Sequence, residues 1–229
     1  MSERLAKRVA GFTTSVFTEM SRLAIRHRAV NLGQGFPDFP GPDFVKEAAI
    51  QAIRADQNQY AASHGTPRLR LAIAETWHRT YGREVDPEAE VTVGSGATEL
   101  ILDAILALVD PGDEVILFEP FYDSYPADIL MAGGLPRFIT LEPPDWHFDQ
   151  QALADLFTPR TRLLVINTPH NPTGKMFSRD ELSFIASLCQ QHDVLVLTDE
   201  VYEQIRFDGV EHTPIATLPG MWERTLTIN

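Results

Sequence analysis

Short apolar runs alternate with segments of helical periodicity from about residue 91 to the end of the chain. The predicted strands lie at 91–93, 115–118, 137–140, 163–167, 194–199 and 225–228. Most of these runs lack a regular polar and apolar alternation, which is typical of strands buried on both faces. Strands that alternate with helices form a mostly parallel sheet with helices on both faces. The pattern therefore predicts an α/β protein.

Helices are predicted between these strands and also before them. Residues 42–53 and 67–81 carry apolar side chains at helical spacing, and Gly82 is typical of a helix end. The helix over 97–109 is apolar nearly all round and is expected to be buried. The other predicted helices lie at 125–131, at 150–157, and from a Ser178–Glu181 capping box onward.

The first forty residues have a different character. The stretch to about residue 30 is expected to be partly helical with arginine-rich faces, and residues 31–42 form a loop with three glycines and three prolines. Because Leu32, Phe36 and Phe39 are large and apolar, we expect them to be buried. The loop is therefore predicted to be irregular but ordered.

Composition and charge exclude several classes of protein. Of the 229 residues, 44% are hydrophobic and 22% are charged, which excludes disorder over the whole chain. The 19 Lys and Arg against 32 Asp and Glu give a net charge of −13. A surface this acidic repels phosphate backbones and anionic lipids, so neither a nucleic-acid partner nor a membrane partner is expected. Any anion site must therefore be local.

The apolar runs, the single cysteine and the spacing of the histidines bear on the cellular location and on metal binding. The start of the chain leads into no apolar targeting segment, and no apolar run is long enough to span a bilayer. Cys189 is the only cysteine, so no disulfide forms within the chain, and a cytoplasmic location is predicted. The seven histidines form no pair at a spacing of three or four residues, so no metal site is predicted.

The first candidate site follows the predicted strand at 91–93. Gly94, Ser95 and Gly96 form a turn that leads directly into a helix starting at Ala97 and Thr98. The free amide groups and dipole of a helix N-terminus favour a phosphate group. A dinucleotide fingerprint would need a third glycine at position 99, where glutamate stands. A plain structural turn is the alternative.

Other candidate residues follow other strand ends, where ligands of parallel sheets bind. Tyr122 could cover a flat ligand or simply pack in the core. Asn171 stands in a rigid loop with two prolines, which a surface turn would also explain. Asp199 ends an apolar run with Tyr202 close behind, and such a carboxylate either meets a cation or caps a helix. Together these groups suit a flat, phosphorylated pyridine.

Four motifs stand in order along the chain, at 31–39 (NLGQGFPDF), 96–98 (GAT), 171–174 (NPTG) and 199–202 (DEVY). Together they resemble the fold-type I, class I and II aminotransferases, which use pyridoxal phosphate. Residues 35–39 and 167–172 are most similar to the kynurenine, glutamine and methionine aminotransferases. The resemblance covers nearly the whole chain.

The resemblance implies which residues contact the cofactor ring. Asp199 would pair with the pyridinium nitrogen of pyridoxal phosphate, and Tyr202 and Asn171 would bond its phenolic oxygen. Tyr122 would stack on the ring. Asp199 and Tyr202 are thus the expected catalytic residues.

It also implies contacts to the phosphate, to the substrate and to a partner subunit. Tyr60 would reach the phosphate of the partner subunit, so a homodimer is expected. Gly35 and Asn171 would contact the substrate, an amino acid or a 2-oxo acid. The phosphate would be held in the same subunit by Gly96, Ala97 and Thr98.

The resemblance further implies a domain layout, and this chain departs from the family's pattern at one place. Residues 1–40 would form an N-terminal arm and part of a small domain, and residues 41–229 would form a cofactor-binding large domain that is incomplete at its C-terminus. The family's Schiff-base lysine follows the strand at 225–228, so its segment is expected to be absent from this chain. The three lysines present are Lys7, Lys46 and Lys175.

The implied activity is transfer of an amino group from an amino acid to a 2-oxo acid. Two alternatives remain at this point. One is a short, non-catalytic relative that binds pyridoxal phosphate or a partner chain. The other is a pyridoxal-phosphate-dependent β-lyase acting on sulfur amino acids. The sequence does not identify the amino donor or the acceptor.

Overall fold

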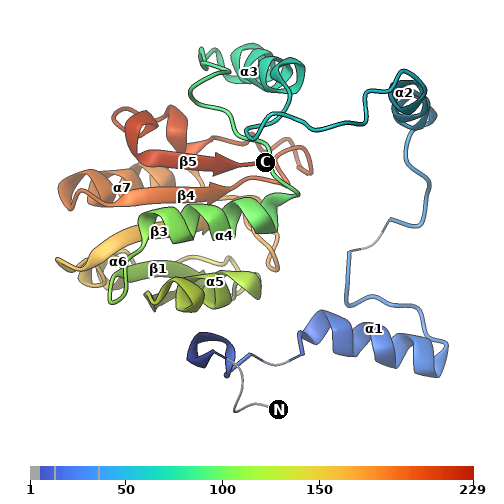
Figure 1. The fold of residues 1–229 in the computed structure, drawn as a ribbon. Coiled ribbons are helices and arrows are strands. Elements are labelled where there is room, and N and C mark those ends of the chain that lie inside the picture. The colour runs from blue at the N-terminus through green and yellow to red at the C-terminus, as the bar shows by residue number, and fades with distance from the viewer. Residues whose placement is uncertain (1–5, 13, 36) are drawn as a thin grey trace.

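The computed structural model describes residues 6–12, 14–35 and 37–229, and its centre is a five-stranded parallel sheet (Figure 1). Phe36 lies outside the described residues. The strand order is β2-β1-β3-β4-β5. The strands are β1 (Glu114–Glu119), β2 (Leu135–Thr140), β3 (Thr161–Asn167), β4 (Leu195–Asp199) and β5 (Thr225–Ile228). All four pairings are parallel, which confirms the predicted fold class.

Helices cover both faces of this sheet, and alternation along the strands divides the core into two clusters. The helices are α1 (Val16–His27), α2 (Asp43–Arg54), α3 (Pro67–Tyr81), α4 (Ala97–Leu108), α5 (Ser124–Ala132), α6 (Gln150–Asp155) and α7 (Arg179–Gln191), with short 3-10 helices at Lys7–Val9, Ile215–Thr217 and Trp222–Arg224. On β1, Val115 and Leu117 pack with residues of α4 and α5, whereas Ile116 and Phe118 pack with residues of α6 and α7.

The helix boundaries follow the local signals. Ser178 and Glu181 form the predicted capping box at the start of α7. Gly82 and Gly133 end α3 and α5 in the left-handed conformation, with φ of 67° and 85°. Glycine adopts this conformation without a steric penalty, so these ends are encoded locally.

The predictions for residues 91–93 and for the burial of α4 are wrong. Residues 91–93 are not a strand: no neighbouring strand lies beside them among the described residues, and Val93 bonds only through its N–H to His64 O at 3.1 Å. A strand needs a partner for its ladder. The helix α4 is buried on one face only, because Leu106 on its outer side is 51% exposed.

The N-terminal segment extends away from the sheet. Figure 1 shows α1 and α2 apart from it, joined by extended chain. Leu32 and Phe39 are 90% and 72% exposed, so the prediction that they are buried is wrong for this chain alone. No described element covers them. The proposed boundary at residue 40 stays a prediction.

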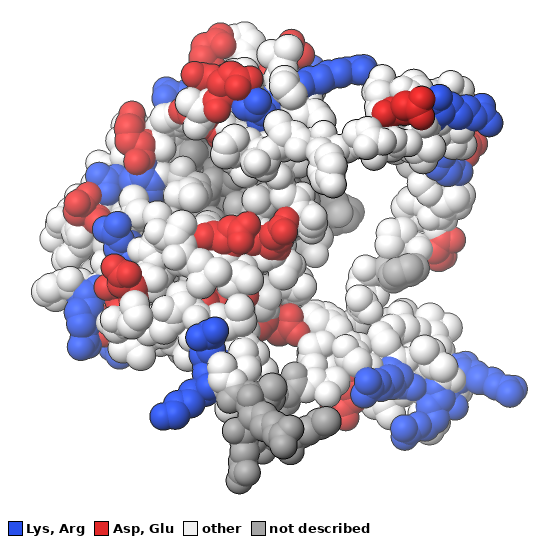
Figure 2. Space-filling model, in the orientation of Figure 1, with Lys and Arg blue, Asp and Glu red and all other residues white. Residues whose placement is uncertain are grey.

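Charged side chains are unevenly spread over the face drawn in Figure 2. Acidic groups gather near α3 and over the middle of α4, while basic groups gather along α1. Among the described residues, no helix combines the length and the apolar character needed to cross a bilayer.

Asp128 on α5 allows a test of how strongly this fold buries a charged side chain. It is 6% exposed, and its Oδ2 has no partner among the described residues. Burial raises its pKa from 3.8 to about 6. The buried charge therefore destabilises the fold fully above about pH 6, and this penalty disappears below the unfolded value. We expect Asp128→Asn to raise the free energy of unfolding by about 1 kcal/mol near pH 7, since partial solvent screening limits the gain.

Urea unfolding at several pH values measures this difference. The two proteins should converge only as the pH falls below the unfolded pKa of 3.8, since the carboxyl is then protonated in both states. A constant difference across this range would contradict a buried, titrating Asp128.

Candidate functional site

A cavity of about 160 Å³ opens where the carboxyl ends of β3 and β4 meet the start of α4. Parallel sheets bind ligands at this edge because loops and helix N-termini converge there. The cavity is lined by Ala97, Thr98, Ile101, Tyr122, Tyr125, Asn167, Asn171, Asp199, Val201 and Tyr202. Six of the predicted site residues, from four separate segments, therefore share one hollow.

Asp199 is the buried acid of this cavity, and it is 5% exposed at the end of β4. Tyr125 Oη donates to Asp199 Oδ2 at 2.6 Å, and the Val201 N–H donates to Oδ1 at 3.2 Å. Burial raises the pKa of Asp199, and the two hydrogen bonds offset part of this increase. Such a carboxylate is well placed to accept a proton or to pair with a cationic ligand group.

Asn167 fixes the loop on the other side of the cavity. Its side chain donates to Asp199 O at 2.9 Å and accepts from the Asn171 N–H at 2.6 Å. The Thr168 N–H also donates to Asp199 O, at 3.0 Å. The buried Asn167 thus ties the loop that carries Asn171 to the end of β4, which sets the spacing between the amide and the acid.

Aromatic rings form one wall. Tyr122 packs edge-on against Tyr125 with ring centroids 5.7 Å apart, and Phe17 of α1 lies 6.2 Å from Tyr122. Tyr202 is 38% exposed at the cavity. Burial raises the pKa of Tyr125 well above its usual range, so Tyr125 remains a hydrogen-bond donor to Asp199.

The first residues of α4, Ala97 and Thr98, form the other end of the cavity, and the predicted site residue Gly96 directly precedes them without lining it. Gly96 precedes the helix with φ of 99°, a side chain there would meet no atom within 4 Å, and no side chain caps this N-terminus. The Ser95 N–H instead donates to the carboxylate of Glu99. The uncapped amides at Ala97 and Thr98 suit an anionic group. The donor set thus fits a flat ligand with a cationic ring atom near Asp199 and an anionic end near α4.

Other predicted site residues do not reach this cavity. Gly35 is exposed and Tyr60 is fully exposed, and neither lines it. No lysine is among the described residues that line it: Lys175 Nζ pairs with Glu181 Oε1 at 2.7 Å. The expected roles of Gly35 and Tyr60 stay predictions.

The sequence interpretation missed Tyr125 and Asn167. Tyr125 was predicted only as part of a helix, and Asn167 only as a strand end and part of the motif at 167–172, with no site role for either. The available signal was a polar side chain in an apolar segment, because a buried phenol or amide needs a partner.

We expect Tyr125→Phe to raise the pKa of Asp199 further, because the bond to the charged carboxylate is lost. The Asp199 carboxyl can be followed by infrared difference spectroscopy as the pH changes. Ser124→Ala, next to Tyr125 on the same helix, is the control. An unchanged pKa of Asp199 in Tyr125→Phe would contradict the bond.

Comparison with known proteins adds independent findings. Residues 27–226 match the sequence model of the family described as aminotransferase class I and II. The chain is 48% identical over 236 residues to kynurenine–oxoglutarate transaminase 1 of Homo sapiens, and it is 50% identical over 224 residues to a probable N-succinyldiaminopimelate aminotransferase of Mycobacterium tuberculosis. Both alignments cover 97% of this chain and 56% of the relative.

Solved structures of aminotransferases are similar to this chain over nearly its whole length. N-succinyldiaminopimelate aminotransferase from Mycobacterium tuberculosis superposes with a TM-score of 0.93 at 49% identity, over 97% of this chain and 59% of that one. A protein of Escherichia coli with a methionine aminotransferase function also gives 0.93, at 40% identity, over 97% and 58%. The chain thus spans a little more than half the length of the relatives it matches.

Proposed function

The chain belongs to the class I and II aminotransferases, and from this membership we propose that it forms the cofactor-binding part of an enzyme that transfers an amino group from an amino acid to a 2-oxo acid. The family depends on pyridoxal phosphate in general. The observation that carries the proposal is the cavity that gathers Asp199, Tyr202, Asn171, Tyr122 and the start of α4.

The residues of the cavity fit this cofactor by their chemistry. A buried carboxylate with a raised pKa suits a protonated pyridine nitrogen, and the Tyr202 phenol and Asn171 amide suit a phenolic oxygen. A tyrosine ring suits the flat face. The uncapped amides beside Gly96, Ala97 and Thr98 suit the phosphate.

Pyridoxal phosphate supplies, when bound, an electron-poor ring that takes up the electron pair left at the amino acid α-carbon. The chain's own residues would maintain that state. Asp199 would keep a proton on the ring nitrogen, and Tyr125 and Val201 would hold the Asp199 carboxylate in place. Asn167 would set the distance of Asn171 from it.

The substrates are proposed at the level of class. The relatives are named for kynurenine, N-succinyldiaminopimelate and methionine, and the name of the kynurenine relative also contains oxoglutarate, a 2-oxo acid. We therefore propose an amino acid donor and a 2-oxo acid acceptor for the whole protein. A cytoplasmic homodimer, with Tyr60 reaching the partner's phosphate and Gly35 at the substrate, belongs to the same proposal.

Two measurements test the function. Titration of the chain with pyridoxal 5′-phosphate, followed by its absorption band, should show saturable binding at one site per chain. In the complete enzyme, a panel of amino acids with 2-oxoglutarate should give keto-acid-dependent transfer. Pyruvate release from sulfur amino acids without a keto acid would indicate a β-lyase instead, and no binding would contradict the cofactor site.

A further inference from the structure

A second polar cluster lies behind the cavity, on the two neighbours of Asp199. Thr198 and Glu200 are fully buried, and Thr198 Oγ1 donates to Glu200 Oε1 at 3.0 Å. The Glu200 N–H donates to Ile228 O of β5 at 2.7 Å. Glu200 is therefore fixed through both its backbone and its side chain.

His212 completes the bonding of this carboxylate. His212 Nε2 lies 2.7 Å from Glu200 Oε2, and the two side chains are 2% and 0% exposed. His212 Nδ1 is buried without a partner among the described residues, so its bond to Glu200 is the polar contact that orients this ring. Burial raises the pKa of Glu200, and His212 and Thr198 offset part of that increase.

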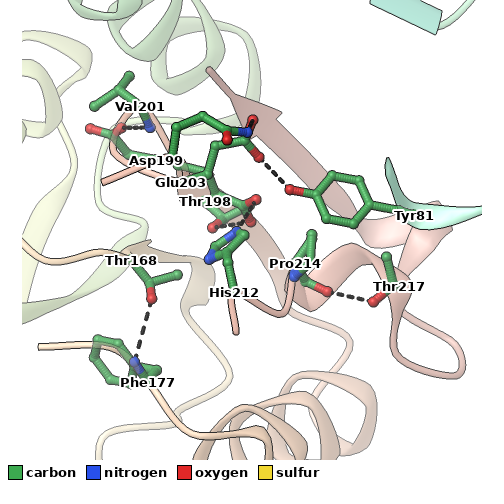
Figure 3. Close-up of polar contacts among 12 residues, drawn as sticks. Tyr81, Thr168, Phe177, Thr198, Asp199, Val201, Glu203, His212, Pro214 and Thr217 are labelled. Carbon is green, nitrogen blue, oxygen red and sulfur yellow. Dashed lines mark hydrogen bonds and ion pairs between the residues drawn. The ribbon is translucent and has the colours of Figure 1, made fainter. Parts of the chain in front are cut away.

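A second contact holds the turn after Glu200. The Tyr81 phenol, at the end of α3, donates to Glu203 Oε2 (Figure 3). The Glu203 N–H donates to Glu200 O at 2.9 Å, and the Ile205 N–H donates to Tyr202 O at 2.7 Å. One carboxylate oxygen from each of Glu200 and Glu203 and one ring nitrogen of His212 lie within 4.8 Å of one another. The Glu200–His212 contact and the contact of Tyr81 with Glu203 therefore belong to one cluster.

This cluster lies beneath the segment that carries the exposed Tyr202. Val201 and Tyr202 line the cavity, while Glu200 and Glu203 on either side of them are held from behind. A turn anchored only by its own backbone bonds would leave the half-exposed Tyr202 free to move. The two carboxylate contacts remove that freedom.

We propose that Glu200, Glu203, His212 and Tyr81 form a polar brace that positions Tyr202, and with it the Val201 N–H on Asp199, at the cavity. The four are positioning residues and do not touch the ligand. The inference rests on the proposed function, since it assigns a purpose to the position of Tyr202 relative to pyridoxal phosphate.

A double-mutant cycle tests the brace. We expect His212→Phe to weaken binding of pyridoxal 5′-phosphate by about fivefold and to shift its absorption band, as loss of one well-placed hydrogen bond to the ligand would. In a Tyr202→Phe background, His212→Phe should weaken binding much less, because the group it positions is already gone. Equal effects in both backgrounds would overturn the proposal.

A milder variant guards against a folding defect. Tyr81→Phe removes only the phenol contact to Glu203, and we expect it to change the same absorption band in the same direction. A further test variant is Glu200→Gln, which changes the central carboxylate of the brace. Its matched control is Glu114→Gln. Glu114 is 1% exposed and bonds Thr158 and Arg160, but it lies about 16 Å along β1 from the strand's carboxyl end. Only Glu200→Gln should alter cofactor binding.

Hydrogen exchange of residues 200–212 separates this inference from the proposed function. We expect faster exchange there in His212→Phe and Tyr81→Phe, and not in Glu114→Gln. If the parent chain bound no cofactor, the proposed function would fail. If the parent bound cofactor but exchange at 200–205 were unchanged in both variants, the brace alone would be refuted.

Discussion

Asp199→Ala in the complete enzyme is expected to lower the rate of amino transfer by about three orders of magnitude while leaving the fold intact. Among the described residues, Asp199 provides the only carboxylate that lines the cavity. Without it, no residue there can hold a proton on a pyridine nitrogen. The fold should tolerate the change, because burial already raises the pKa of Asp199 and its charge does not stabilise the native state.

Single-turnover kinetics with a fixed amino donor measure this effect, and circular dichroism checks the fold. Asp128→Ala is the matched control, since Asp128 is also a buried aspartate with a raised pKa but does not line the cavity. The control should retain its rate within about threefold, as expected of a change away from the reacting groups. Parent-like turnover in Asp199→Ala would remove the central role of this residue.

The position of this acid could be predicted from the sequence because two strong rules coincide there. The run 194–197 is wholly apolar and is followed by Thr198 and Asp199, and parallel strands place their carboxyl ends at the ligand-binding edge. The same rules placed Asn171 and Tyr122 beside it. Local order in the chain therefore predicted which segments converge.

What the sequence did not reveal were contacts set by packing between distant elements. Tyr125 is a buried phenol on a mainly apolar helix, and its partner Asp199 is 74 positions away. The Glu200–His212 pair joins a strand end to a loop that has no periodic pattern. Such pairs depend on how the helices seat on the sheet, which composition and periodicity do not specify.

The wrong predictions have a related cause. Residues 91–93 have a strand-like composition, but a strand forms only beside a neighbour, and none lies there among the described residues. Leu32 and Phe39 are apolar enough for a core but lie on an arm that contacts little of the sheet. In both cases the local preference is real, and the surface that would satisfy it is not supplied by the described residues.

Tyr122→Ala is expected to weaken the binding of pyridoxal 5′-phosphate by about tenfold to a hundredfold, since stacking of an aromatic ring on a flat heterocycle contributes roughly 1–3 kcal/mol. Tyr122 is half-buried at the cavity wall and is backed by Phe17 and Tyr125, so its ring is held in place before any ligand arrives. Equilibrium dialysis with spectroscopic detection measures the affinity.

Two variants decide whether stacking or core packing is lost. Tyr122→Phe keeps the ring and should bind nearly as well as the parent, because the flat face provides the contact. Phe121→Ala is the matched control: its ring stacks on Phe138 with centroids 5.4 Å apart and does not line the cavity. It should lose stability without losing affinity. Unchanged affinity in Tyr122→Ala, with a fall in stability equal to that of Phe121→Ala, would show that Tyr122 serves only the core.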